Sequence, residues 1–304
     1  ALVILTQEGL LERLQRKGTF VRQTGNRLST VGVYSSSAIW NFDIKELDFA
    51  RRVYRDFQDI LKENNVREEF FFDTRPVSEQ TSPWPALETA AAEHKIQALF
   101  ALSAAVRHLK WLPQLPLPAA GLGSLLPSHV EYDLNQFVDS GIQSLAAKGC
   151  RSVGLICTME KKNTEHFYRH FNSAISEARL ELRKEWIRSP SEYVRNQERY
   201  GYEQFRLLWK QPNRPDGVLV FTDNTARGVV TAVLQEKVKV PEDLHLALHR
   251  NRELEYICPF PATFLESSCR LVAEKYWEQL QSQLLGEQPK PVNLKYSQIE
   301  NKTA

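Results

Sequence analysis

The side chain best placed to bind a small molecule is Asp223. The apolar run Val218–Thr222 precedes it and is typical of a buried strand, and residues 224–236 then follow a helical pattern. Open parallel sheets bind ligands at the carboxyl ends of their strands, beside the N-termini of helices. We therefore expect Asp223 to contact a ligand. The alternative is that its carboxylate caps the following helix.

A second group of polar and aromatic side chains follows the strand-like run Val31–Tyr34. Two interpretations of Trp40 stay open, which are stacking on a ligand ring and packing between the loop and the core. Ser36, Asn41 and Asp43 are candidate hydrogen-bonding groups for the same ligand. Asn41 or Asp43 fits the cap of the next helix equally well.

Close to the N-terminus, two strand-like apolar runs flank a basic tip that contains glycine. Basic side chains at such a tip can reach phosphates or the minor groove of DNA. We predict DNA contacts from Arg13, Arg16, Lys17 and Gly18, and the alternative is a solvated basic hairpin. The net charge of +2 is too small for the whole chain to bind nucleic acid, so any contact with DNA must be local.

Signatures of catalysis are missing from the sequence. It has no glycine-rich phosphate loop and no nucleophile elbow. The four cysteines show no paired metal spacing and are interpreted as buried free thiols. We therefore expect no enzyme activity, no cofactor and no metal.

Short β-rich runs alternate with longer helical patterns from residue 30 to the end of the chain. This alternation predicts parallel sheets with helices on both faces. With 304 residues, of which 42% are hydrophobic and 25% charged, the chain is long enough for two α/β subdomains. No apolar window approaches the length of a membrane span, and no secretion signal precedes the first strand, so we expect a cytoplasmic protein without membrane contact.

One stretch of sequence resembles a known family. Residues 215–228 combine an apolar strand, Asp223 and a helix that carries Ala226 and Gly228, and Val240-Pro241-Glu242-Asp243 follows. This order resembles the effector-binding domain of the lac-repressor family. Gly228 is expected to let its helix pack close to the sheet.

The resemblance covers about residues 28 to 300 and implies a periplasmic-binding-protein-like type I fold. Two doubly wound parallel-sheet subdomains would be joined by three crossing segments. The implied boundaries place residues 28–133 and 264–286 in an N-terminal subdomain. Residues 134–263 and 287–304 form the C-terminal subdomain, and residues 1–27 precede both.

Two positions depart from the family pattern. Phe167 stands where the family often has an arginine, and the strand after residue 243 ends in His249-Arg250-Asn251 instead of a carboxylate-rich sequence. Arg250 and Asn251 are therefore candidate ligand contacts, whereas His249 is interpreted as a core or surface residue. The resemblance implies a sugar or a sugar-like effector, and Arg250 favours an anionic one.

The N-terminal hairpin resembles the wing of a GntR-type winged helix-turn-helix. Together the two resemblances imply a transcriptional regulator, present mostly as its effector-binding portion. Its partners would be a small-molecule effector, operator DNA and a second copy of the chain in a homodimer. Because little sequence precedes the wing, we expect residues 1–304 alone to bind operator DNA weakly. The alternative function is a transport-type periplasmic sugar-binding protein on the same fold.

Overall fold

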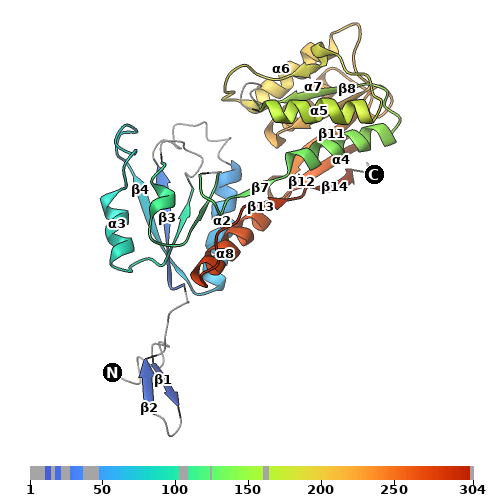
Figure 1. The fold of residues 1–304 in the computed structure, drawn as a ribbon. Coiled ribbons are helices and arrows are strands. Elements are labelled where there is room, and N and C mark those ends of the chain that lie inside the picture. Colours follow the sequence, from blue (N-terminus) through green and yellow to red (C-terminus); the bar gives the residue numbers. More distant parts are fainter. Residues whose placement is uncertain are drawn as a thin grey trace.

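The computed structural model describes residues 11–14, 18–21, 28–36, 48–102, 109–123, 125–159 and 164–301. It contains an N-terminal β-hairpin and two α/β lobes, each built around its own sheet (Figure 1). The chain passes between the lobes three times. This is the mixed α/β, periplasmic-binding-protein-like architecture that the sequence predicted.

The hairpin consists of β1 (Leu11–Leu14) and β2 (Gly18–Val21). The two strands pair antiparallel, with Leu11 opposite Val21 and Leu14 opposite Gly18. The strand pairing expected from the two apolar runs is therefore present in the backbone.

The N lobe contains a parallel sheet in the order β4-β3-β5-β6. Its central strand β3 is buried along its whole length, as expected for a parallel strand with helices on both faces. The edge strand β4 begins with the exposed charges of residues 67–69, which discourage pairing with another chain at that end. The strands are β3 (Thr30–Ser36), β4 (Arg67–Asp73), β5 (Ala98–Ala101) and β6 (Ala119–Gly121).

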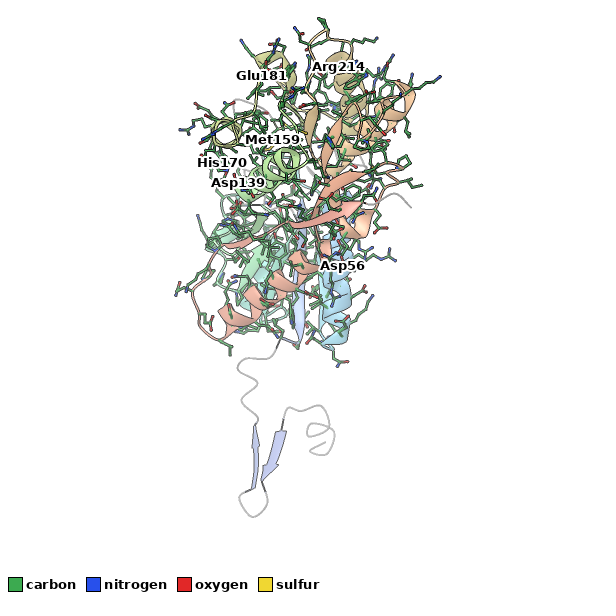
Figure 2. The ribbon with its side chains drawn as sticks, turned by 90° about the vertical axis from the view of Figure 1, so that its right-hand side faces the viewer. Asp56, Asp139, Met159, His170, Glu181 and Arg214 are labelled. Carbon is green, nitrogen blue, oxygen red and sulfur yellow. The ribbon has the colours of Figure 1, made fainter. Side chains whose placement is uncertain are left out.

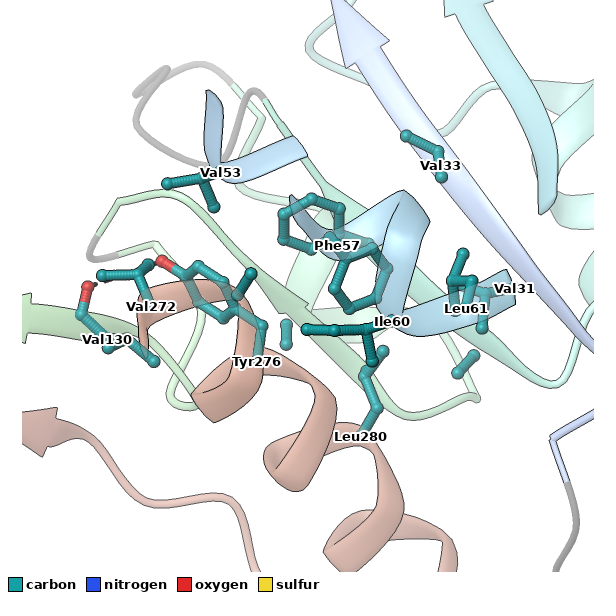
Figure 3. Packing of buried hydrophobic residues seen from close by; sticks show 14 of the residues in the cluster. Val31, Val33, Val53, Phe57, Ile60, Leu61, Val130, Val272, Tyr276 and Leu280 are labelled. Atoms are coloured by element: carbon teal, nitrogen blue, oxygen red, sulfur yellow. Dashed lines mark hydrogen bonds between the residues drawn. The ribbon is translucent and has the colours of Figure 1, made fainter. Parts of the chain in front are cut away.

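Helices α2 (Asp48–Glu63) and α8 (Cys269–Leu284) cover one face of this sheet, and α3 (Pro85–Ala92) covers the other. Figure 3 shows the first face, where Phe57 of α2 meets the side chains of α8. The rings of Phe57 and Phe100 stack with centroids 4.2 Å apart, and Tyr276 lies 5.3 Å from Phe100. Residues more than 200 positions apart in sequence thus form one core.

The C lobe contains a sheet in the order β14-β12-β11-β10-β8-β9, in which only the pair β12–β14 is antiparallel. The strands are β8 (Val153–Cys157), β9 (Ile187–Arg188), β10 (Gly217–Phe221), β11 (His245–Asn251), β12 (Ala262–Ser267) and β14 (Ser297–Asn301).

Alternate residues of these strands pack on opposite faces, which explains why the strands are apolar throughout. Leu219 and Leu265 face α4 (Leu134–Ala147) and α5 (Glu165–Glu177). Val218, Val220 and Phe264 face α6 (Gln197–Trp209) and α7 (Asp223–Gln235). Figure 2 shows Asp139 of α4 and His170 of α5 together in this lobe, whereas Asp56 lies in the N lobe.

Three crossing segments join the lobes. One leaves β7 (Val130–Tyr132) for α4, one runs from β12 into α8, and one leaves β13 (Val292–Leu294) for β14. Strands β7 and β13 pair in parallel, with Tyr132 opposite Leu294. They lie side by side where the lobes meet (Figure 1).

Several predicted boundaries were wrong because long-range pairing overrides local propensity. Residues 264–286 were expected in the N-terminal subdomain, but Glu266 and Ser267 pair with β11, and α8 starts at Cys269. The C lobe therefore keeps residues 264–267. Leu294 packs in the core of the N lobe, so this lobe extends through β13. Before β9, residues Lys184–Trp186 form a 3-10 helix.

Gly228 makes a different close approach from the one predicted. A Cβ atom built on Gly228 would lie 1.8 Å from the carbonyl oxygen of Glu198, and one on Gly201 would lie 2.1 Å from the carbonyl oxygen of Thr225. The two glycines therefore allow α6 and α7 to touch backbone to backbone. Gly228 serves the contact between helices, not the contact between helix and sheet.

We expect Gly228→Ala to destabilise the C lobe by about 1–3 kcal/mol or more, because the added methyl group forces the two helix backbones apart. Urea denaturation of the purified protein measures the change. Thr231→Ala, an exposed site on the same helix, is the matched control. A Gly228→Ala variant as stable as the control would contradict the backbone contact between α6 and α7.

Candidate functional site

A cavity of about 360 Å³ lies between the two lobes, next to the crossing segments. Side chains from both lobes line it. The N lobe contributes the start of α2, strand β7 and Val272 of α8, and the C lobe contributes the carboxyl ends of β10, β11 and β12. A molecule in this cavity therefore contacts both lobes at once.

The C-lobe wall is formed where β10 ends and α7 begins. Phe221, Thr222, Asp223 and Asn224 line the cavity in succession. The Thr222 hydroxyl donates a hydrogen bond of 2.5 Å to the side-chain carbonyl of Gln197, the first residue of α6. The starts of α6 and α7 thus present carboxylate and amide groups side by side.

His249, at the carboxyl end of β11, is a buried polar residue of the cavity wall. Only 7% of its surface is exposed, and the rings of Phe137, Phe221 and Tyr296 surround it at centroid distances of 5.0 to 6.0 Å. Its Nε2 atom lies 3.0 Å from the hydroxyl of Ser267, whereas no hydrogen-bond partner reaches Nδ1 within the described part of the chain. Burial lowers the pKa of His249 and Asp223 opposes this shift, so the ring is neutral at neutral pH.

The opposite wall belongs to α2 and to the crossing segments. Asp48 and Phe49 begin α2, and Tyr132 ends β7. Tyr296 reaches the cavity from the segment between β13 and β14, with its ring 4.8 Å from that of Tyr132. Aromatic faces therefore border the cavity near the hinge, as in sites that hold flat or ring-shaped ligands.

The charge of the wall is negative. Among the described lining residues there are three carboxylates, Asp48, Glu131 and Asp223, and no lysine or arginine. The side-chain carboxylates of Asp48 and Asp223 have no hydrogen-bond or ion-pair partner among the described residues. The wall therefore favours ligands that bring hydrogen-bond donors or positive charge.

Of the residues predicted to bind a ligand, Asp223 lies on the cavity wall and Ser36 does not. Ser36 is fully buried at the end of β3, and its hydroxyl donates a 2.5 Å hydrogen bond to Gln80. Gln80 in turn donates to the backbone carbonyl of Arg75. Ser36 therefore holds together a loop of the N lobe.

Arg250 is not a wall residue either, which corrects the expectation of an anion contact. Its guanidinium donates two hydrogen bonds to the buried carboxylate of Glu266, at 3.0 and 2.7 Å, and lies 4.2 Å from the Phe264 ring centre. Successive residues of a strand point to opposite faces, so His249 faces the cavity and Arg250 faces away. Arg250 therefore does not favour an anionic effector.

Asn251 is on the same face of β11 as His249 but lies beneath the wall. It is only 1% exposed, and its side-chain oxygen accepts hydrogen bonds from the backbone N–H of Glu253 and from the thiol of Cys269, both at 3.3 Å. It ties the end of β11 to the start of α8.

For the remaining predicted residues, the structure describes no side-chain positions. Trp40, Asp43, Arg16 and Lys17 lie outside the described residues. Arg13 belongs to β1 and Gly18 to β2, where the structure describes the backbone only.

Sequence reasoning missed several wall residues, namely Asp48, Tyr132, Gln197, Phe221, His249 and Tyr296. Strand alternation was the available signal for His249, because it separates residue 249 from residue 250. Tyr132 and Tyr296 carried no local signal, since they meet through pairing of segments that are far apart in sequence.

The two-lobed fold and its cavity are typical of ligand-binding proteins. Residues 142–300, more than half of the chain, match the family model described as periplasmic binding protein-like domain. The chain belongs to this family. Its two-lobed fold, its three crossing segments and its cavity between the lobes agree with that membership.

Among characterised relatives, the chain is similar to proteins named HTH-type transcriptional repressor PurR. The protein from Mannheimia succiniciproducens is 26% identical over 168 residues, which are 54% of this chain and 49% of that protein. The protein from Glaesserella parasuis is 30% identical over 129 residues, or 42% of this chain and 37% of that protein. The aligned parts span about half or less of these relatives.

Solved structures share the whole fold. A LacI family transcription regulator from Clostridium acetobutylicum superposes with a TM-score of 0.68 at 18% identity, covering 89% of this chain and 98% of that one. The transcription regulator CcpA of Lactococcus lactis gives a TM-score of 0.65 at 17% identity, covering 90% and 98%. At these identities the likeness concerns the fold alone.

None of the helices in the described part of the chain is both long and apolar enough to cross a membrane. No group of three or more histidine, cysteine, aspartate or glutamate side chains among the described residues is arranged to hold a metal ion.

Because burial lowers the pKa of His249, we expect the protein to lose stability as the pH falls. Above the unfolded-state pKa of about 6.5 the histidine contributes no pH dependence. Below it the unfolded chain binds a proton that the folded chain does not, so stability falls by up to about 1.4 kcal/mol per pH unit for each such proton. Urea denaturation between pH 7.5 and 5 measures this slope.

The His249→Asn variant should show a shallower slope, and His94→Asn, an exposed histidine of the N lobe, is the control. The pKa of His245 is also lowered by burial and by Lys148, so part of the slope remains in His249→Asn. Equal slopes in wild type and His249→Asn would mean that His249 does not titrate differently in the folded state.

Proposed function

We propose that this protein is an effector-responsive transcriptional regulator whose two lobes sense a sugar or a sugar-like small molecule. The observation that carries the proposal is the cavity between the lobes, because both lobes and the hinge contribute to its wall. A ligand that contacts both walls stabilises the closed arrangement of the lobes over the open one. The relatives named as transcriptional repressors support the same function.

The chemistry of the wall supports a sugar-like effector. Aromatic rings such as Tyr132 and Tyr296 offer flat apolar faces, while Asp223, Gln197 and Asn224 offer hydrogen-bonding groups. Sugars match both kinds of group, since one face of the sugar ring is apolar and its hydroxyls donate and accept hydrogen bonds. Trp40 and Asp43 remain proposed contacts from the loop before α2.

The proposed output is altered affinity for operator DNA. The N-terminal hairpin, as the wing of a GntR-type DNA-binding module, would place Arg13, Arg16, Lys17 and Gly18 against DNA. Closure of the cleft would change the relative placement of two such modules in a homodimer. A regulator of this kind acts in the cytoplasm, where its operator lies.

An exposed apolar strip supports the homodimer. Phe70 and Phe72 point to the same face of the edge strand β4 and are 44% and 37% exposed. The ring of Tyr54 on α2 lies 6.1 Å from that of Phe70 and extends the strip. Large apolar side chains grouped on one surface are typical of protein interfaces.

We expect replacement of both Phe70 and Phe72 by serine to weaken the homodimer about tenfold or more, because it removes apolar area from the interface. Sedimentation equilibrium measures the dimer constant. Val77→Ser, another exposed apolar site of the N lobe, is the control. A wild-type protein that is monomeric at micromolar concentration would refute the homodimer.

The regulatory function is tested by effector and operator binding together. We expect calorimetric titration with a panel of sugars and sugar derivatives to identify a binder. That binder should change operator affinity of the complete gene product by about 5- to 150-fold, the usual range of allosteric coupling. Binding of the effector with no change in DNA affinity would refute the switch, and would favour transport-type ligand binding on the same fold.

A further inference from the structure

Two unpaired carboxylates lie on opposite walls of the cavity. Asp48 is the first residue of α2 in the N lobe, and Asp223 is the first residue of α7 in the C lobe. Both line the cavity, and neither is engaged by a lysine, an arginine or a hydrogen-bond donor among the described residues. Closure of the lobes brings these like charges toward each other, so an empty cavity opposes closure.

The third carboxylate is Glu131 of β7. The Nε2 atom of His129 lies 3.8 Å from the Glu131 carboxylate, and 57% of the Glu131 side chain is exposed. It therefore adds negative potential at the mouth of the cavity without forming a tight pair. The charged side chains among the described lining residues are therefore all carboxylates.

A separate observation points to a ligand that donates hydrogen bonds. His249 is more than nine-tenths buried in the same wall, and its Nδ1 atom has no partner among the described residues. In the tautomer whose Nε2 donates its proton to the Ser267 hydroxyl, Nδ1 keeps a lone pair for a hydrogen-bond donor. Polar atoms buried without a partner are uncommon, and a ligand that donates a hydrogen bond would satisfy this one.

The aromatic residues of the wall strengthen the case. Phe49, Tyr132, Phe221 and Tyr296 all line the cavity. The face of an aromatic ring carries negative potential and attracts cations. Carboxylates and ring faces therefore select for the same property in a ligand.

We propose that the effector carries a protonated nitrogen, which lies between Asp48 and Asp223 and neutralises the repulsion that holds the cleft open. The expected class is an amino sugar or another polar amine. This inference rests on the proposed function, because it names the chemistry of the effector for the same cavity. It also assigns Asp48, which sequence reasoning overlooked, a role in specificity.

The test uses matched sets of ligands that differ in charge on one skeleton. One set is glucosamine, glucose and glucuronate, and a second is putrescine, 1,4-butanediol and succinate. Calorimetry with the wild-type protein should show the amine of at least one set binding at least about tenfold tighter than its neutral partner, and the carboxylates not binding. Tight binding of a neutral or acidic member, or failure of both amines to bind, would overturn the inference.

Single substitutions test whether Asp48 and Asp223 cause the preference for the amine. Asp223→Asn and Asp48→Asn should each weaken binding of the amine about tenfold or more while changing that of its neutral partner by less than about threefold. Asp59→Asn, which removes an exposed carboxylate elsewhere on α2, should change neither. Far-UV circular dichroism checks that each variant is folded. An unchanged preference for the amine in both cavity variants would overturn the inference.

The outcome also separates this inference from the proposed function. A neutral sugar that binds in the cavity and changes operator affinity would leave the regulatory function standing and refute the protonated nitrogen. An amine that binds through Asp48 and Asp223 without altering operator affinity would support the protonated nitrogen and refute the regulatory function.

Discussion

The arrangement of the two lobes depends on how three crossing segments are held together at one place. Tyr132 is central to this contact. Its hydroxyl accepts a 2.7 Å hydrogen bond from the backbone N–H of Ser268 and lies 3.2 Å from the carbonyl of the same residue. Asp133 donates its backbone N–H to Leu294 at 2.8 Å, and the amide of Gln136 bonds the backbone of Tyr296 in both directions. Relative motion of the lobes is therefore confined to a hinge at these segments.

The hinge and the ligand cavity share residues. Tyr132 and Tyr296 belong to the crossing segments and also line the cavity. Ser267, which meets His249, is followed directly by Ser268, whose hydroxyl caps α8 by accepting from Leu271. A ligand bound at this wall therefore contacts residues of the same backbone segments that set the angle between the lobes. The proposed coupling between ligand binding and closure of the lobes rests on this short route.

The pleat of β11 shows how one strand serves two purposes. His249 faces the cavity, while Arg250 on the other face joins Arg252 in binding the buried Glu266. Glu266 is nearly inaccessible to water, and loss of its partners would leave a buried charge uncompensated. The ion pairs keep β11 and β12 aligned, and that alignment places His249 beside Ser267.

Local sequence determined a large part of this protein. The alternation of strands and helices follows from side-chain periodicity, which acts over a few residues, and it correctly predicted the two α/β lobes. Asp223 could be assigned to the cavity wall because the end of a buried strand and the start of a helix are both local features. The positions of β3 and β10 followed for the same reason, although their ends differ by one or two residues from the predicted runs.

Only the tertiary structure decided which polar residues meet at the cavity. Arg250 and Glu266 are 16 positions apart, and strand pairing brings them together and removes Arg250 from the wall. Asp48 and Asp223 come from different lobes, and Tyr132 and Tyr296 from different crossing segments, so no local pattern relates them. Antiparallel pairing of β14 with β12 likewise requires the complete sheet. These features depend on contacts between distant segments, whose geometry is set by packing of the whole chain and not by the propensity of any one stretch.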